Sequence, residues 1–90
     1  MENAETLKRM VGRRIAELRR GKGYTQEQMA ELLDVGSRYV SRAERGDENL
    51  TLESLAKVAS VLGVRARALL DAPAKTALSV RPGRPRRPKL

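Results

Sequence analysis

The sequence predicts an all-α fold of five short helices followed by a basic C-terminal tail. Apolar residues recur at helical spacing along most of residues 4–71. Glycine interrupts this spacing where helices would end, and a threonine precedes two of the apolar segments, as helix N-caps often do. The 90 residues suit one small domain. We therefore expect a helical domain over residues 1–72 and a tail over residues 73–90.

The composition restricts the chemistry that the chain can perform. It has no Cys and no His, which removes disulfides, thiolate metal ligands and the commonest general base. We find no converging set of carboxylates, Lys and hydroxyls that would serve an enzyme instead. No apolar run approaches membrane-spanning length, and the N-terminus lacks the apolar core of a signal peptide. We thus expect no metal, no cofactor, no membrane contact and an intracellular protein.

Positive charge is concentrated near the C-terminus. The chain has 19 basic and 11 acidic residues, a net charge of +8. Residues 81–89 hold five of the basic residues and no acidic one, so the rest has 14 basic against 11 acidic, a net charge of +3. Basic residues on phosphates release counterions, which favours a polyanionic partner. A net charge of this size also serves solubility, and composition alone leaves both interpretations open.

The first helix is expected over residues 4–20, and Gly21 and Gly23 are expected to end it. Its apolar stripe comprises Leu7, Val11, Ile15 and Leu18. The second helix begins after Thr25, because Thr25 and Gln28 form a capping box and Tyr24 and Met29 stand at staple positions. Its buried face is expected to comprise Met29, Ala30 and Leu33.

A turn, Asp34-Val35-Gly36, should follow, with Val35 filling the core between two helices. The third helix is expected over residues 37–45, with Gly46 as its stop. Val40 and Ala43 point inward. The outward residues are Ser37, Arg38, Ser41, Arg42 and Arg45. Two short helices joined by such a turn form a helix-turn-helix, whose second helix enters the major groove of DNA.

The fourth helix should run from its cap, Thr51, to Gly63, with Leu50 and Leu55 at staple positions. Its apolar face is expected to comprise Leu52, Leu55, Val58, Ala59 and Leu62. A fifth short helix over residues 65–71 should bury Leu69, and Pro73 blocks its continuation.

Anchor residues and their spacings agree with a known family over about residues 7–71. The matching positions are Leu18-Arg19, Gly23 to Gln26, Met29-Ala30, Val35, Val40 to Gly46, Leu55, Leu62 to Val64, and Leu69. This set resembles the helix-turn-helix family of phage repressor and Cro proteins, often called XRE-like. Two shorter segments, residues 38–41 and 49–52, resemble the restriction–modification controller proteins of that family.

The resemblance implies double-stranded DNA as the partner. It places base readout on Ser37, Arg38 and Arg42, and arginine can bond both O6 and N7 of guanine. It places phosphate contacts on Gln26 and the helix start at Thr25. We add Tyr39, Arg45 and Asn49 as candidate phosphate contacts, although Tyr39 could instead contact a base or pack at the turn. The plain alternative for these polar side chains is a solvated helix face.

The resemblance also implies an ion pair between Arg19 and Glu44 that joins the first and third helices. Four features depart from the family pattern: Asp34 replaces a turn glycine, Gly36 replaces a capping Ser or Thr, Ala43 is small, and the loop over residues 47–49 carries two acidic residues. Asp tolerates left-handed backbone, so we expect the turn to survive. We expect another side chain to compensate for Ala43.

The tail segment Pro82-Gly83-Arg84-Pro85-Arg86 resembles an AT-hook, which binds narrow A·T-rich minor grooves. A generic basic tail that adds nonspecific affinity is the favoured alternative. In either case the candidate DNA contacts are Arg81, Arg84, Arg86 and Arg87. The segment 77–80, with apolar Ala77, Leu78 and Val80, and the fifth helix are candidates for a dimer surface.

These observations predict a sequence-specific DNA-binding transcriptional regulator, bacterial or phage, that acts in the cytoplasm on the nucleoid. One such domain contacts few base pairs, so we expect a homodimer on an inverted repeat. Three alternatives stay open at this point. The chain could be an antitoxin, a restriction–modification controller, or an adaptor that uses this fold to bind another regulator.

Overall fold

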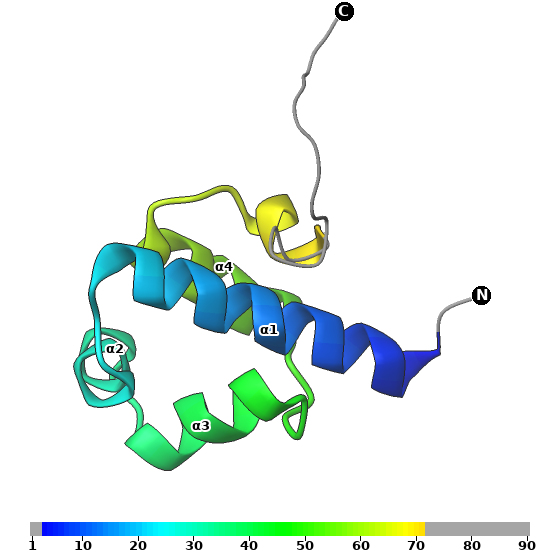
Figure 1. Ribbon diagram of the computed structural model, residues 1–90, viewed down its shortest axis with the longest axis horizontal. Helices are drawn as coiled ribbons and strands as arrows, with labels where there is room; N and C mark the ends of the chain where they lie inside the picture. Colours follow the sequence, from blue (N-terminus) through cyan, green and yellow to red (C-terminus); the bar gives the residue numbers. More distant parts are fainter. Residues whose placement is uncertain (1–2, 72–90) are drawn as a thin grey trace, which may run out of the picture.

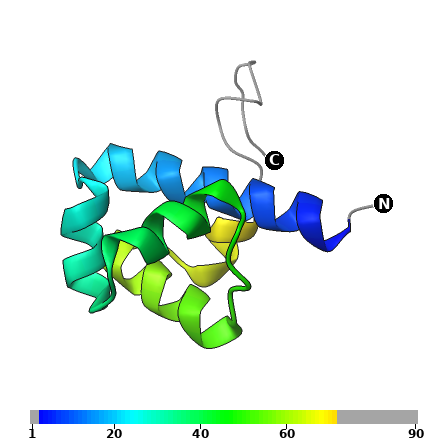
Figure 2. The ribbon, with the colours of Figure 1, turned by 90° about the horizontal axis from the view of Figure 1, so that it is seen from below.

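The computed structural model describes residues 3–71, which form four α-helices and one 3-10 helix (Figure 1). The elements are α1 (Ala4–Lys22), α2 (Gln26–Leu33), α3 (Ser37–Arg45), α4 (Leu52–Leu62) and η1 (Ala66–Leu70). The all-α class is confirmed for this part of the chain, which contains no strand. In Figure 1, α3 lies below α1, and η1 lies on the opposite side of α1. Seen from below, α3 crosses the front of the molecule (Figure 2).

The fifth predicted helix, over residues 65–71, is present as the shorter 3-10 helix η1, so the described residues form four α-helices rather than five. Helices of the 3-10 type occur as short pieces, and η1 is five residues long. Leu69 is fully buried, as expected, and Arg14 Nε donates a hydrogen bond of 3.0 Å to the carbonyl of Ala68. These contacts hold η1 against α1. The predicted boundary between a domain and a tail falls at residues 72–73, outside the described residues.

The helix ends follow the local signals with one exception. Thr25 and Gln28 form the capping box, with bonds of 2.9 and 3.0 Å, and Thr51 caps α4. Helix α1 continues through Gly21 and ends at Gly23, whose φ of 79° is left-handed. Gly21 alone therefore does not stop the helix, because the left-handed residue that terminates α1 comes two positions later.

The turn between α2 and α3 keeps its predicted length but not its predicted packing. Asp34 adopts the left-handed conformation, with φ 61° and ψ 47°, where the family usually has glycine. The expectation that Val35 fills the core is wrong, since its side chain is 37% exposed. Leu33 and Val40, on either side of the turn, are buried in the core. Val35 lies at the edge of the core, partly exposed to solvent.

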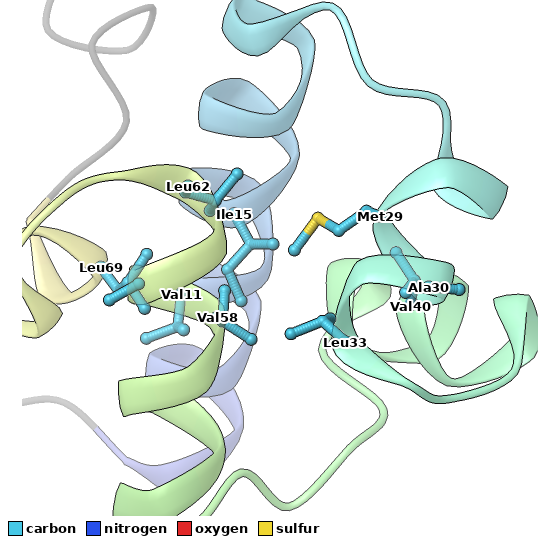
Figure 3. Close-up of a cluster of buried hydrophobic side chains, with 10 residues drawn as sticks. Val11, Ile15, Met29, Ala30, Leu33, Val40, Val58, Leu62 and Leu69 are labelled. Atoms are coloured by element: carbon cyan, nitrogen blue, oxygen red, sulfur yellow. The ribbon is translucent and has the colours of Figure 1, made fainter.

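Ten buried side chains from all five elements form the core (Figure 3). They are Val11, Ile15, Met29, Ala30, Leu33, Val40, Val58, Ala59, Leu62 and Leu69. Leu52 was expected to join them but is 85% exposed. It is the first residue of α4, one turn before the face that packs. Leu50 and Leu55, the staple pair, are partly buried against the core.

Helices α1 and α3 approach each other closely, and two glycines permit it. A Cβ on Gly12 would lie 2.5 Å from the carbonyl oxygen of Ala43 and 2.6 Å from that of Glu44. A Cβ on Gly46 would lie 2.9 Å from the Cα of Arg9. The prediction was that another side chain compensates for the small Ala43. The backbones of the two helices approach each other closely instead. This contact fixes the last turn of α3 on α1.

No helix within residues 3–71 combines the length and the apolarity that a membrane span requires.

Candidate nucleic-acid interface

The polar face of α3 borders an open hollow of about 500 Å³. Its lining comprises Gln26 from α2 and Ser37, Arg38, Ser41, Arg42 and Arg45 from α3. The three residues predicted to read bases are therefore together on one surface, beside Gln26. Helical geometry explains this arrangement, because positions one, two, five, six and nine of α3 share a face. Figure 2 shows α3 at the front of the molecule.

In the described part of the chain, two of the three arginines of this face are paired with acidic residues, and the third is not. Arg42 Nη2 lies 3.2 Å from Glu48 Oε2, and Arg45 Nε lies 3.2 Å from Asp47 Oδ2. Arg45 Nη1 also donates a bond of 3.1 Å to Ser41 Oγ. Among residues 3–71, Arg38 has no hydrogen-bond or ion-pair partner. Its guanidinium thus keeps all five donors for a ligand.

A largely buried hydrogen-bond network joins α1, α2 and α3 next to this face. Arg19 Nε donates to Glu44 Oε2 at 2.7 Å, and Arg19 Nη2 donates to Glu44 Oε1 at 3.2 Å. Arg19 Nη1 donates to the carbonyl of Tyr24 at 2.7 Å, and Gln26 Nε2 donates to Glu44 Oε1 at 2.9 Å. The two charged side chains are only 12% and 7% exposed. The network fixes α3 relative to α1 and orients Gln26.

The start of α2 lies beside the same hollow. The Thr25 side chain caps the backbone N–H of Gln28, while the first N–H groups of a helix have no partner within it. These groups and the positive end of the helix dipole favour a phosphate. Gln26 was predicted to contact a phosphate through its side chain. That side chain is held by Glu44 and still lines the hollow.

Two of the predicted phosphate contacts lie elsewhere. Tyr39 is half-buried and lines a separate hollow with Val35 and residues of α4. Asn49 lines a third hollow, beside the start of α1 and Leu70. The tail candidates lie outside the described residues, as do residues 77–80; they are Arg81, Arg84, Arg86 and Arg87.

Sequence reasoning missed that the acidic loop folds back onto α3. The backbone N–H of Asp47 bonds the carbonyl of Arg42 at 2.8 Å, which turns Glu48 toward the α3 arginines. Acidic residues that directly follow a helix with basic residues in its last turn are the available signal. That signal does not say which acid meets which arginine. The close approach of α3 at Gly12 was not predicted either, because a glycine within a helical pattern does not indicate which element packs against it.

The fold and this surface define a helix-turn-helix domain with an exposed basic recognition helix. The helix-turn-helix family model matches residues 15–69, and the chain belongs to this family.

Relatives of known name agree with this assignment. The transcriptional regulator SinR of Bacillus subtilis is 40% identical over 63 residues, which cover 69% of this chain and 57% of SinR. The chain thus spans little more than half of that relative. A solved structure of SinR in complex with DNA has a TM-score of 0.65, with 69% of this chain and 100% of that chain covered. The restriction–modification controller protein C.AhdI of Aeromonas hydrophila is 38% identical, with a TM-score of 0.65 over 68% of this chain and 92% of its own.

Proposed function

We propose that this protein is a sequence-specific DNA-binding transcriptional regulator that inserts α3 into the major groove. The observation that carries the proposal is the polar surface on which Ser37, Arg38 and Arg42 meet around the hollow. Arginine is the side chain most often used to read guanine, and serine adapts as donor or acceptor. The membership of the chain in the helix-turn-helix family supports the same function.

The remaining polar groups of the hollow suit phosphate contacts. The N-terminus of α2, with Thr25 and Gln26, presents backbone N–H groups next to the proposed base-reading residues of α3. Arg45, in the last turn of α3, is 61% exposed and can reach a backbone phosphate at the far end. Phosphate contacts on both sides of Ser37, Arg38 and Arg42 would fix the register of α3 on the duplex.

A homodimer on an inverted repeat completes the proposal. Helix α3 has nine residues and is about 14 Å long at 1.5 Å per residue, so it spans few base pairs. Two copies related by a twofold axis double the sequence that is read. The site of action would be the nucleoid in the cytoplasm.

A restriction–modification controller is the second candidate function. It is favoured by the similarity to C.AhdI and to the control protein C.BamHI of Bacillus amyloliquefaciens, which is 33% identical over 63 residues. A controller would bind the promoter of its own operon and have a nuclease gene beside it. Binding to that promoter distinguishes it from a regulator of unrelated genes.

Arg38→Ala is expected to relax base preference at one position of the half-site by about 1–3 kcal/mol, because one bidentate guanine contact is lost. Titration against DNAs that differ by single base pairs measures this effect. Arg67→Ala is the matched control, since Arg67 is exposed on η1, across α1 from α3. A uniform loss of affinity for all sequences in Arg38→Ala would identify a phosphate contact and remove Arg38 from base readout.

The five basic residues of positions 81–89 are proposed to add electrostatic affinity. Deletion of residues 81–90 should reduce the slope of log K against log salt by up to about 4.5, at roughly 0.9 per phosphate contact. The preferred sequence should stay the same. Binding measured at several salt concentrations tests this, and an unchanged slope would show that the tail does not contact DNA.

A further inference from the structure

The two acidic residues that follow α3 pair with two of its arginines in different ways. Glu48 and Arg42 meet at 3.2 Å, with side chains 21% and 47% exposed. Asp47 and Arg45 also meet at 3.2 Å, but their side chains are 60% and 61% exposed. The distances are equal, so the difference lies in burial. Glu48 rests against the domain, whereas Asp47 projects into solvent.

The position of Glu48 is fixed by the end of α3. Gly46 ends the helix with a left-handed φ of 84°. A Cβ added at this residue would clash with Arg9. The next N–H, from Asp47, bonds back to the carbonyl of Arg42 at 2.8 Å. The backbone just before Glu48 is thus tied to the helical turn that carries Arg42. A carboxylate held in this way restricts the guanidinium that it faces.

We propose that Glu48 is a specificity-determining residue that positions Arg42 for base readout; this rests on the function proposed above. The carboxylate faces one terminal nitrogen, Nη2, and leaves other N–H groups of Arg42 available. A guanine accepts two bonds, at O6 and N7, so the pair and the base contact are compatible. A guanidinium held beforehand loses less conformational entropy on binding than a free one.

The same carboxylate also opposes nonspecific binding. It lies beside a face that would approach phosphates, and a negative charge there weakens attraction to any DNA sequence. Arg42 next to Glu48 is also a poorer point charge for a phosphate than unpaired Arg38. Glu48 therefore favours base contact over backbone contact for Arg42, and both effects increase discrimination between sequences.

The experiment compares Glu48→Gln with Asp47→Asn in the full-length protein. Each change removes one negative charge from the same loop and keeps the side-chain shape, so both should strengthen binding to nonspecific DNA to a similar degree. Preference for the base pair read by Arg42 should fall roughly three- to tenfold in Glu48→Gln, the size typical of coupling between paired side chains. It should stay unchanged in Asp47→Asn. Sites selected from random DNA and titrations against single-base variants provide both readouts.

Arg42→Ala and the double variant Arg42→Ala/Glu48→Gln complete the comparison. Arg42→Ala should abolish preference at one base pair, and adding Glu48→Gln should then change preference no further. If Arg42→Ala acts at one position but Glu48→Gln matches Asp47→Asn, positioning by Glu48 is excluded while base readout by Arg42 stands. If Arg42→Ala weakens all sequences equally, Arg42 is not a reader, and this inference falls together with that part of the proposed function.

Discussion

Gly12→Ala is expected to destabilise the domain by about 3 kcal/mol or more, although alanine ordinarily favours a helix over glycine. The added methyl would lie 2.5 Å from one carbonyl oxygen of α3 and 2.6 Å from the next. Both are backbone atoms within a helix, so no side-chain rotation relieves the clash. Helix α3 would have to move away from α1, which strains the Arg19–Glu44 pair as well.

Gly21→Ala is the matched control, because it makes the same change in the same helix. A Cβ on Gly21 meets no atom within 4 Å. This variant should therefore gain up to about 1 kcal/mol, the usual difference in helix propensity. Urea titration followed by circular dichroism measures both variants. Equal stability of Gly12→Ala and the parent would show that α1 and α3 are not in backbone contact at Gly12.

A comparison of Gly46 with Gly12 shows which parts of the fold can be predicted from the sequence. Caps such as Thr25, and the stop at Gly46, are signals within a few residues of the structure they specify, and the helices that they bound were predicted closely. The close approach at Gly12 depends on residues more than thirty positions away in the chain, so no local pattern reports it. The contacts that hold η1 also come from distant positions, because Arg14 of α1 donates to the carbonyl of Ala68.

The candidate site divides along the same line. Ser37, Arg38 and Arg42 were predicted together because one helix face and a family pattern specify them. The pairing of Glu48 with Arg42 was not, because it requires the chain to reverse after Gly46. The exposed positions of Val35 and Leu52 were also mispredicted. Both residues are apolar and lie next to buried positions in the sequence, and their exposure becomes clear only in the folded structure.

Glu44→Ala is expected to lower the free energy of unfolding by about 3 kcal/mol. Removal of the carboxylate leaves Arg19 12% exposed and without its counter-ion, and Gln26 without its acceptor. The bond from Arg19 to the carbonyl of Tyr24 remains, which places the cost at the lower end for a broken buried pair. By contrast, Asp47→Ala breaks a pair that is about 60% exposed on both sides and should cost less than about 0.5 kcal/mol.

A double variant separates the cost of an isolated charge from the value of the pair itself. Arg19→Met/Glu44→Gln removes both charges and keeps an amide oxygen for Gln26, so it should recover most of the stability lost in Glu44→Ala. Thermal unfolding of the three proteins measures this recovery. If the double variant is as unstable as Glu44→Ala, the network contributes through its hydrogen-bond geometry and not through charge compensation. Base preference, measured well below the unfolding temperature, should change less than stability in Glu44→Ala, because Glu44 does not line the hollow that holds the proposed base contacts.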